Sequence, residues 1–188
     1  MSDSKVTYSI SAMLSGVLIA ALAVVGLMAP HVDENSHLVS AGDYAVQTGI
    51  VISAALAFGG LLGLRMAQKE RPRFGRLGNA GSLVALAGEA IIVTANIVTL
   101  PTGDPVTAVH AIGFLAFFAG SVLLAIATHR VGLLPRWSAV LLGATPVVLF
   151  AGPPGGLVVG ASWIAIGWAL RNATVRDAGS KPAGAPAV

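Results

Sequence analysis

The chain has 188 residues, of which 55% are hydrophobic and 10% are charged, with a formal net charge of +3 and no cysteine. Such a low charged fraction excludes an ordinary soluble domain, in which about a quarter of the residues are charged, and the absence of cysteine excludes disulfides and thiolate metal sites. The basic residues form short clusters between apolar runs, which indicates a membrane protein and no nucleic-acid partner.

Six apolar segments follow one another along the chain, separated by polar or proline-containing stretches. The first is too long, and Pro30 follows it too closely, for a cleaved signal peptide. The fifth begins at a proline and contains Pro146, which predicts a kink. After the sixth, a stretch rich in Ala, Gly and Pro predicts a disordered cytoplasmic tail over residues 172–188. The predicted membrane-spanning helices cover residues 7–29, 44–68, 77–100, 106–128, 135–152 and 155–171.

These segments predict an all-α fold, a single polytopic domain over residues 1–171 built as a bundle of six transmembrane helices. With six crossings, both termini and both basic loops share one side of the membrane, and all eleven Lys and Arg fall there. The positive-inside rule therefore predicts cytoplasmic N- and C-termini in a cell inner (plasma) membrane. The opposite side holds Asp33, Glu34, Asp43 and Asp104.

Small residues recur at four-residue spacing in several spans, and this spacing lets helix backbones approach closely. The pattern predicts a compact bundle, and a homodimer face is a second use of the same pattern. The lipid bilayer is the other expected partner. The stripes include Ala55, Gly59 and Gly63 in the second span, Ala116 and Gly120 in the fourth, and Gly156 and Gly160 in the sixth.

Glu89 is the only acidic or basic residue in the middle of an apolar span. A charge there costs about 2.5 kcal/mol or more. On a helical wheel Glu89 shares one stripe with Gly78, Ser82, Ala85 and Asn96, which predicts that this stripe faces other helices. Two interpretations follow: a structural carboxyl hydrogen-bonded to a neighbouring helix, or a site for a proton or a cationic species.

Aromatic residues fall at a similar predicted depth. Counting from the middle of each span places Phe117 and Trp163 level with Glu89, and Phe114 close by. An acid surrounded by aromatic faces could protonate an apolar molecule and stabilise the cation that forms. The alternative interpretation is that these aromatic residues are ordinary core.

Three polar residues fall nearer the outer surface, at similar depth to one another: Gln47, Asn96 and His110. They define a polar path in which His110 passes a proton through Asn96 to Glu89. The alternative is an interfacial histidine bonded to its own neighbouring turn.

No metal or cofactor is predicted. The spacing of His31, Asp33, Glu34 and His37 matches no strong metal motif, so this loop is interpreted as a solvated connection. The sequence also lacks a Gly-rich phosphate loop and paired Asp-rich motifs, which argues against ATP-driven transport and against Asp-rich prenyl transfer.

The first functional hypothesis is a membrane enzyme that protonates and cyclises an apolar, isoprenoid-type substrate. In it Glu89, His110 and Asn96 are catalytic, and Phe114, Phe117, Trp163 and Gln47 bind the substrate. In size and helical plan the chain resembles the small bacterial membrane terpene cyclases of indole-sesquiterpenoid pathways. Residues 132–137, GLLPRW, are similar to small membrane proteins of GC-rich, actinobacterial-type bacteria. That second resemblance implies a bacterial inner membrane and no defined activity.

Two further hypotheses use the same acid. A proton-coupled exporter would let Glu89 bind either a proton or a hydrophobic cation, and Glu89→Asp should then shift the pH dependence of export. A non-catalytic membrane subunit would pair Glu89 with a polar group of its partner. In that case Glu89→Gln should be tolerated, because Gln keeps the shape and polarity.

Overall fold

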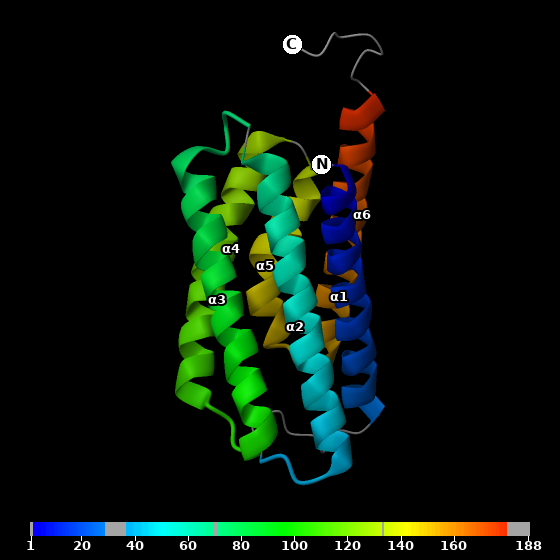
Figure 1. Ribbon diagram of the computed structural model, residues 1–188, viewed down its shortest axis with the longest axis vertical. Helices are drawn as coiled ribbons and strands as arrows, with labels where there is room; N and C mark the ends of the chain where they lie inside the picture. The colour runs from blue at the N-terminus through cyan, green and yellow to red at the C-terminus, as the bar shows by residue number, and fades with distance from the viewer. Residues whose placement is uncertain (1, 29–36, 70, 133, 180–188) are drawn as a thin grey trace.

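The computed structural model describes residues 2–28, 37–69, 71–132 and 134–179. This part of the chain folds into six helices joined by short connections, which confirms the all-α prediction (Figure 1). Most helix ends lie a few residues beyond the predicted spans, because the polar first and last turns fall outside an apolar window. The helices are α1 (Ser2–Met28), α2 (Ala41–Gln68), α3 (Gly75–Thr102), α4 (Thr107–Val131), α5 (Arg136–Leu149) and α6 (Pro153–Gly179).

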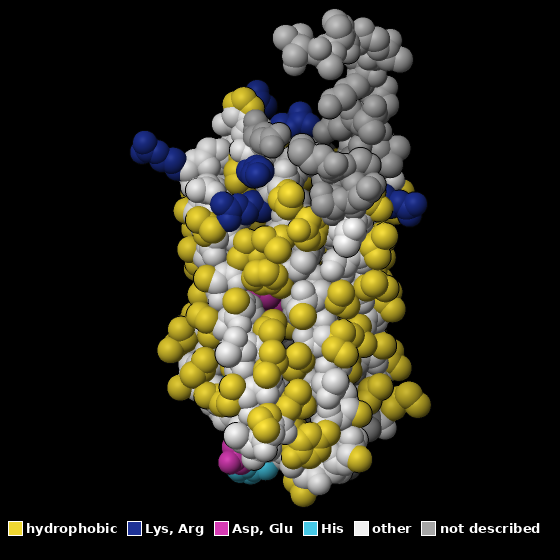
Figure 2. Space-filling view, viewed as in Figure 1, with side chains coloured by type: hydrophobic (Ala, Val, Ile, Leu, Met, Phe, Trp, Pro, Cys, Tyr) yellow, Lys and Arg dark blue, Asp and Glu magenta, His cyan; other side chains and the backbone are white. Residues whose placement is uncertain are grey.

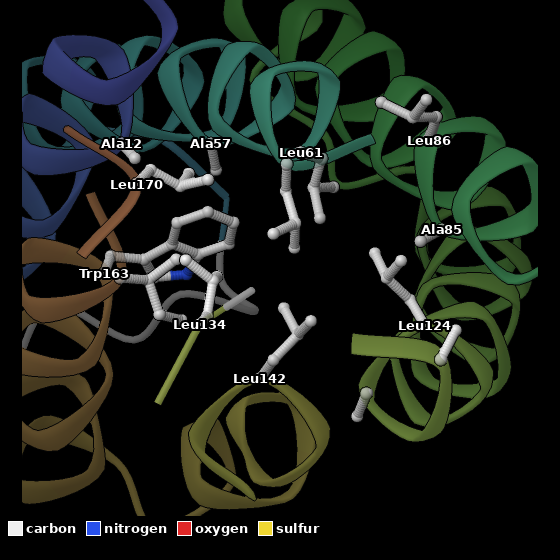
Figure 3. Close-up of a cluster of buried hydrophobic side chains, with 14 of the residues drawn as sticks. Ala12, Ala57, Leu61, Ala85, Leu86, Leu124, Leu134, Leu142, Trp163 and Leu170 are labelled. Carbon is white, nitrogen blue, oxygen red and sulfur yellow. The ribbon is translucent and has the colours of Figure 1, made fainter. Parts of the chain in front are cut away.

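The six helices form a closed ring. Each helix packs against the next along the chain, and α6 packs against α1 to complete the circle. Figure 3 shows buried apolar side chains projecting from the helices into the interior, among them Leu61 of α2, Leu142 of α5 and Trp163 of α6. The ring therefore gives every helix one side facing its neighbours and the interior and one side facing outward.

Five helices in the described part of the chain are long and apolar enough to cross a membrane, namely α1 to α4 and α6. The fifth predicted span, residues 135–152, is longer than the helix that the structure has there, α5. The 14 residues of α5 rise about 21 Å, less than the roughly 30 Å hydrocarbon core of a bilayer. Pro146 provides no backbone N–H, and the chain leaves the helix soon after it through tight turns in which Phe150 N–H donates to the Val147 carbonyl.

The last helix is longer than predicted. α6 reaches Gly179, so residues 172–179 are helical although the sequence predicted a disordered tail from residue 172. These residues are too polar to be included in a predicted membrane span. They contain no proline, and the next one, Pro182, lies beyond the end of the helix, so the helix can continue through them. The remainder of the predicted tail, residues 180–188, lies outside the described residues.

The small-residue stripes pack within the chain. A Cβ placed on Gly120 of α4 would lie 2.1 Å from the backbone nitrogen of Ala85 in α3, so only glycine allows this approach. Gly160 of α6 meets Gly16 of α1 in the same way, and Gly63 of α2 meets Tyr8 of α1. The glycines of these stripes therefore serve contacts between helices of one chain.

Charged side chains separate toward the two ends of the molecule. On the face shown in Figure 2, Lys and Arg gather at the end where α1 begins and α6 ends, and acidic and histidine side chains lie at the other end. At that second end Leu38 N–H donates to the carbonyl of Gly103 over 2.9 Å, and His37 Nδ1 lies 2.5 Å from Asp104 Oδ1. These contacts join the segment before α2 to the connection between α3 and α4.

Candidate functional site

Glu89 lies in the middle of α3 with only 5% of its surface exposed. The predicted stripe is confirmed as the buried face of α3, because Gly78, Ser82, Ala85 and Asn96 are buried with it. Glu89 is the only Asp or Glu in the central part of a described helix. Figure 2 shows a small acidic surface at mid-height, framed by apolar side chains, which agrees with this low exposure.

The glycine before Glu89 shows which side of α3 lies against α4. A Cβ on Gly88 would lie 2.3 Å from the backbone nitrogen of Phe117, so α3 and α4 are in backbone contact at this level. Successive helical residues are about 100° apart, so Glu89 is turned away from the line of closest approach to α4. Asn96, seven residues later and on the same side of α3, contacts α2. Glu89 is therefore directed toward the α2 side of the ring.

Gln47 of α2 and Asn96 of α3 form a buried polar pair. Gln47 Nε2 donates to Asn96 Oδ1 over 2.8 Å and to the Asn96 carbonyl over 3.3 Å. Asn96 Nδ2 donates in turn to the Ile92 carbonyl over 2.8 Å. The prediction that Gln47 and Asn96 share one depth is confirmed, and the pair joins α2 to α3 two helical turns from Glu89.

This pair should be measurable as a coupling between the two helices. We expect Gln47→Leu and Asn96→Leu to be non-additive by about 1 kcal/mol in a double-mutant cycle, the range found for hydrogen bonds between membrane helices. Equilibrium unfolding in detergent micelles would provide the four free energies. Thr94→Val, on an exposed position of α3, is the control and should show no coupling to Gln47→Leu. Additive effects of the two Leu variants would contradict the contact.

The carboxyl of Glu89 makes no hydrogen bond with the part of the chain that the structure describes. An ionised carboxylate buried without a partner is strongly disfavoured, so such a group is either protonated or paired with a cation that enters the site. The structural hypothesis, in which a neighbouring helix hydrogen-bonds Glu89, has no contact to support it among the described residues.

The proposed proton path through His110 is not a chain of contacts. His110 is exposed on α4, whereas Asn96 is buried and bonded to Gln47 and Ile92. None of these three hydrogen bonds of Asn96 involves Glu89 or His110. The structure thus brings together Gln47 and Asn96, and leaves His110 outside their network.

The aromatic residues do not form one pocket around the acid. Phe117 is buried on α4 and lies level with Glu89 through its contact with Gly88. Phe114 packs edge-on against Phe150, with ring centroids 4.8 Å apart. Trp163 is buried on the other side: its ring lies against Gly60 of α2, across the interior from Ala85 and Leu86 of α3 (Figure 3).

Two buried polar atoms have no hydrogen-bond partner among the described residues: Ser121 Oγ on α4 and Gln68 Nε2 at the end of α2. Gln68 Oε1 accepts a bond from Thr128 Oγ1 over 3.1 Å, which joins α2 to α4. Ser121 lies one helical turn from Phe117. Nothing in the local sequence distinguishes Gln68 from an ordinary polar helix end, so only the fold reveals its burial.

The loop residues that could have bound a metal have a different role where they can be described. His37 pairs with Asp104, as noted above, and His31, Asp33 and Glu34 lie outside the described residues. Within the described ranges no three His, Cys, Asp or Glu side chains gather into a group that could hold a metal ion.

Comparison with known proteins adds no further constraint. No protein-family model, curated protein or solved structure matches the chain. Glu89 and its surroundings are therefore the features that bear on function.

Proposed function

We propose that this chain is an integral membrane carrier in which Glu89 alternately binds a proton and a hydrophobic cation. The observation that supports this proposal is the burial of the Glu89 carboxyl at mid-helix without a hydrogen bond to the described residues. An acid held in place by structural bonds would have partners on a neighbouring helix. An exchange site needs a carboxyl free to take either occupant.

The exchange follows from charge balance. When Glu89 loses its proton, the carboxylate is stable in the apolar interior only with a cation beside it. A hydrophobic cation matches both the charge and the apolar walls, and its departure lets a proton return. Each cation that binds thus displaces one proton. The Gln47–Asn96 pair would keep α2 and α3 together at the outer end of this site.

The membrane topology belongs to the same proposal. Six crossings with cytoplasmic termini would place all eleven Lys and Arg on the cytoplasmic side of a bacterial inner membrane. In this arrangement α5 and the turn that follows it together complete the fifth crossing. The gathering of basic side chains at one end supports it (Figure 2).

The topology is directly testable, because the natural chain has no cysteine. We expect Asp104→Cys to react with a membrane-impermeant maleimide in intact cells. Arg76→Cys and Arg171→Cys should react only after the membrane is permeabilised. Labelling of Arg171→Cys in intact cells would show that the last two helices do not return the chain to the cytoplasm.

Carrier activity can be tested in proteoliposomes loaded with a pH-sensitive dye. Ethidium added outside should release protons from the lumen of vesicles that contain the protein, at a rate that saturates with ethidium concentration. Vesicles without protein report the passive rate. Equal rates with and without protein, across several hydrophobic cations, would contradict the proposal.

A second candidate is the isoprenoid cyclase, favoured by the burial of Phe117 level with Glu89. A protonated carboxyl beside an aromatic ring can start a cationic cyclisation. It requires an aromatic pocket, and Trp163 lies on the other side of the interior, so we rank it second. Cells fed isoprenoid precursors would distinguish the two: a new isomer of unchanged mass, made by the wild type and absent with Glu89→Gln, would establish the enzyme.

A further inference from the structure

The connection between α2 and α3 forms a cationic cavity at the basic end of the bundle. It has a volume of about 420 Å³ and lies where α2 ends and α3 begins. Three of its lining residues carry a positive charge, and none of those described is acidic; Glu70, in the same connection, lies outside the described residues. The lining consists of Lys69, Arg71, Pro72, Phe74, Gly75, Arg76 and Asn79.

A hydrogen bond to Arg65 orients one wall of the cavity. Arg65 Nη2 donates to Asn79 Oδ1 over 2.8 Å. The acceptor atom of the Asn79 amide is thus occupied, and its NH₂ group, which has no partner among the described residues, is left as a donor. The ring of Phe74 is buried against Gly78, so the apolar floor of the cavity is fixed.

We propose that this cavity binds the phosphate of an anionic phospholipid headgroup. Lys and Arg side chains with an amide donor supply the charge and hydrogen bonds that a phosphate diester requires. This inference rests on the topology proposed above, which places this end of the bundle at the cytoplasmic surface, where anionic headgroups attract basic residues. Leu83 and Val84, exposed on the next turns of α3, offer an apolar surface for the acyl chains.

The proposal predicts a charge-dependent and site-dependent lipid preference. Native mass spectrometry of the purified full chain in detergent, titrated with phosphatidylglycerol or phosphatidylcholine, should show tighter binding of phosphatidylglycerol. Removing one cation near a membrane surface weakens binding about fivefold, so Lys69→Gln/Arg76→Gln should weaken phosphatidylglycerol binding about 25-fold. The control Arg130→Gln/Arg136→Gln removes two exposed cations outside the cavity and should change it little.

Three results would overturn the proposal. Equal binding of the two lipids would show that the cavity does not distinguish an anionic headgroup from a zwitterionic one. An equal loss in the control variant would show a diffuse attraction to the whole basic surface. Inorganic phosphate that competes fully with phosphatidylglycerol at millimolar concentration would identify a soluble phosphate, and not a lipid, as the occupant.

Discussion

Glu89→Gln should abolish cation-driven proton release while the protein remains folded. Gln keeps the size and polarity of Glu but cannot exchange a proton, so the chemistry of the site is removed with little change in packing. Because the Glu89 carboxyl makes no hydrogen bond with the described residues, none is broken by the substitution. The proteoliposome assay, with protein amount and folding checked by size-exclusion chromatography, gives the result.

A second substitution separates a functional acid from a structural one. Glu89→Leu should also abolish exchange, yet raise the free energy of unfolding by about 1–3 kcal/mol, because a buried polar group without a partner is replaced by an apolar one. A gain in stability with a loss of function is typical of a functional site. Glu89→Asp serves as the positive control and should keep exchange with an altered pH dependence. Exchange that survives in Glu89→Gln, or a destabilised Glu89→Leu, would contradict the proposed role.

Glu89 and its stripe could be predicted because two simple signals coincide. A single ionisable residue stands out in an apolar run, and the helical repeat fixes which residues share its face. The same arithmetic placed Gln47 and Asn96 at one depth, and the fold makes them a bonded pair. The depth of a residue in the bundle can therefore be predicted from the sequence when polar residues clearly mark both ends of its span.

The sequence could not predict which neighbouring helix a side chain faces. Trp163 has the predicted depth, but α6 closes the ring against α1, so its side chain faces Gly60 on the α2 side and not α3. Gln68 and Thr128 meet across the interior from α2 and α4, which no spacing within one helix could reveal. Which helices are neighbours depends on close glycine contacts between distant segments.

The hydropathy of the sequence also could not predict where α5 ends. Apart from Arg136, residues 135–152 carry no charged side chain, and the hydropathy of a residue such as Phe150 is the same whether it lies in a helix or in a turn. Pro146 and the left-handed Gly152, with φ of 67°, end the helix for backbone reasons that side-chain polarity does not record. The result is a short helix beside a long one: α5 has 14 residues and α4 has 25.

Gly120→Leu should destabilise the protein strongly, because it drives a side chain into the backbone of α3. The Cβ it introduces would lie 2.1 Å from the backbone nitrogen of Ala85 and 2.6 Å from its Cα. Neither atom belongs to a flexible side chain, so α3 and α4 must move apart. Overpacking a helix contact costs about 1–3 kcal/mol and occasionally more, and contact with backbone places this site at the upper end of that range.

The neighbouring residue provides a matched control for this substitution. Ala119 lies exposed on the adjacent position of α4, so Ala119→Leu adds a similar side chain to the same turn without entering the contact. We expect its thermal midpoint in detergent to stay close to that of the wild type while that of Gly120→Leu falls well below it. Because Gly88 and Glu89 lie on the same helix pair, separation of α3 and α4 should also impair exchange. A Gly120→Leu protein as stable as Ala119→Leu would show that the two helices are not in backbone contact.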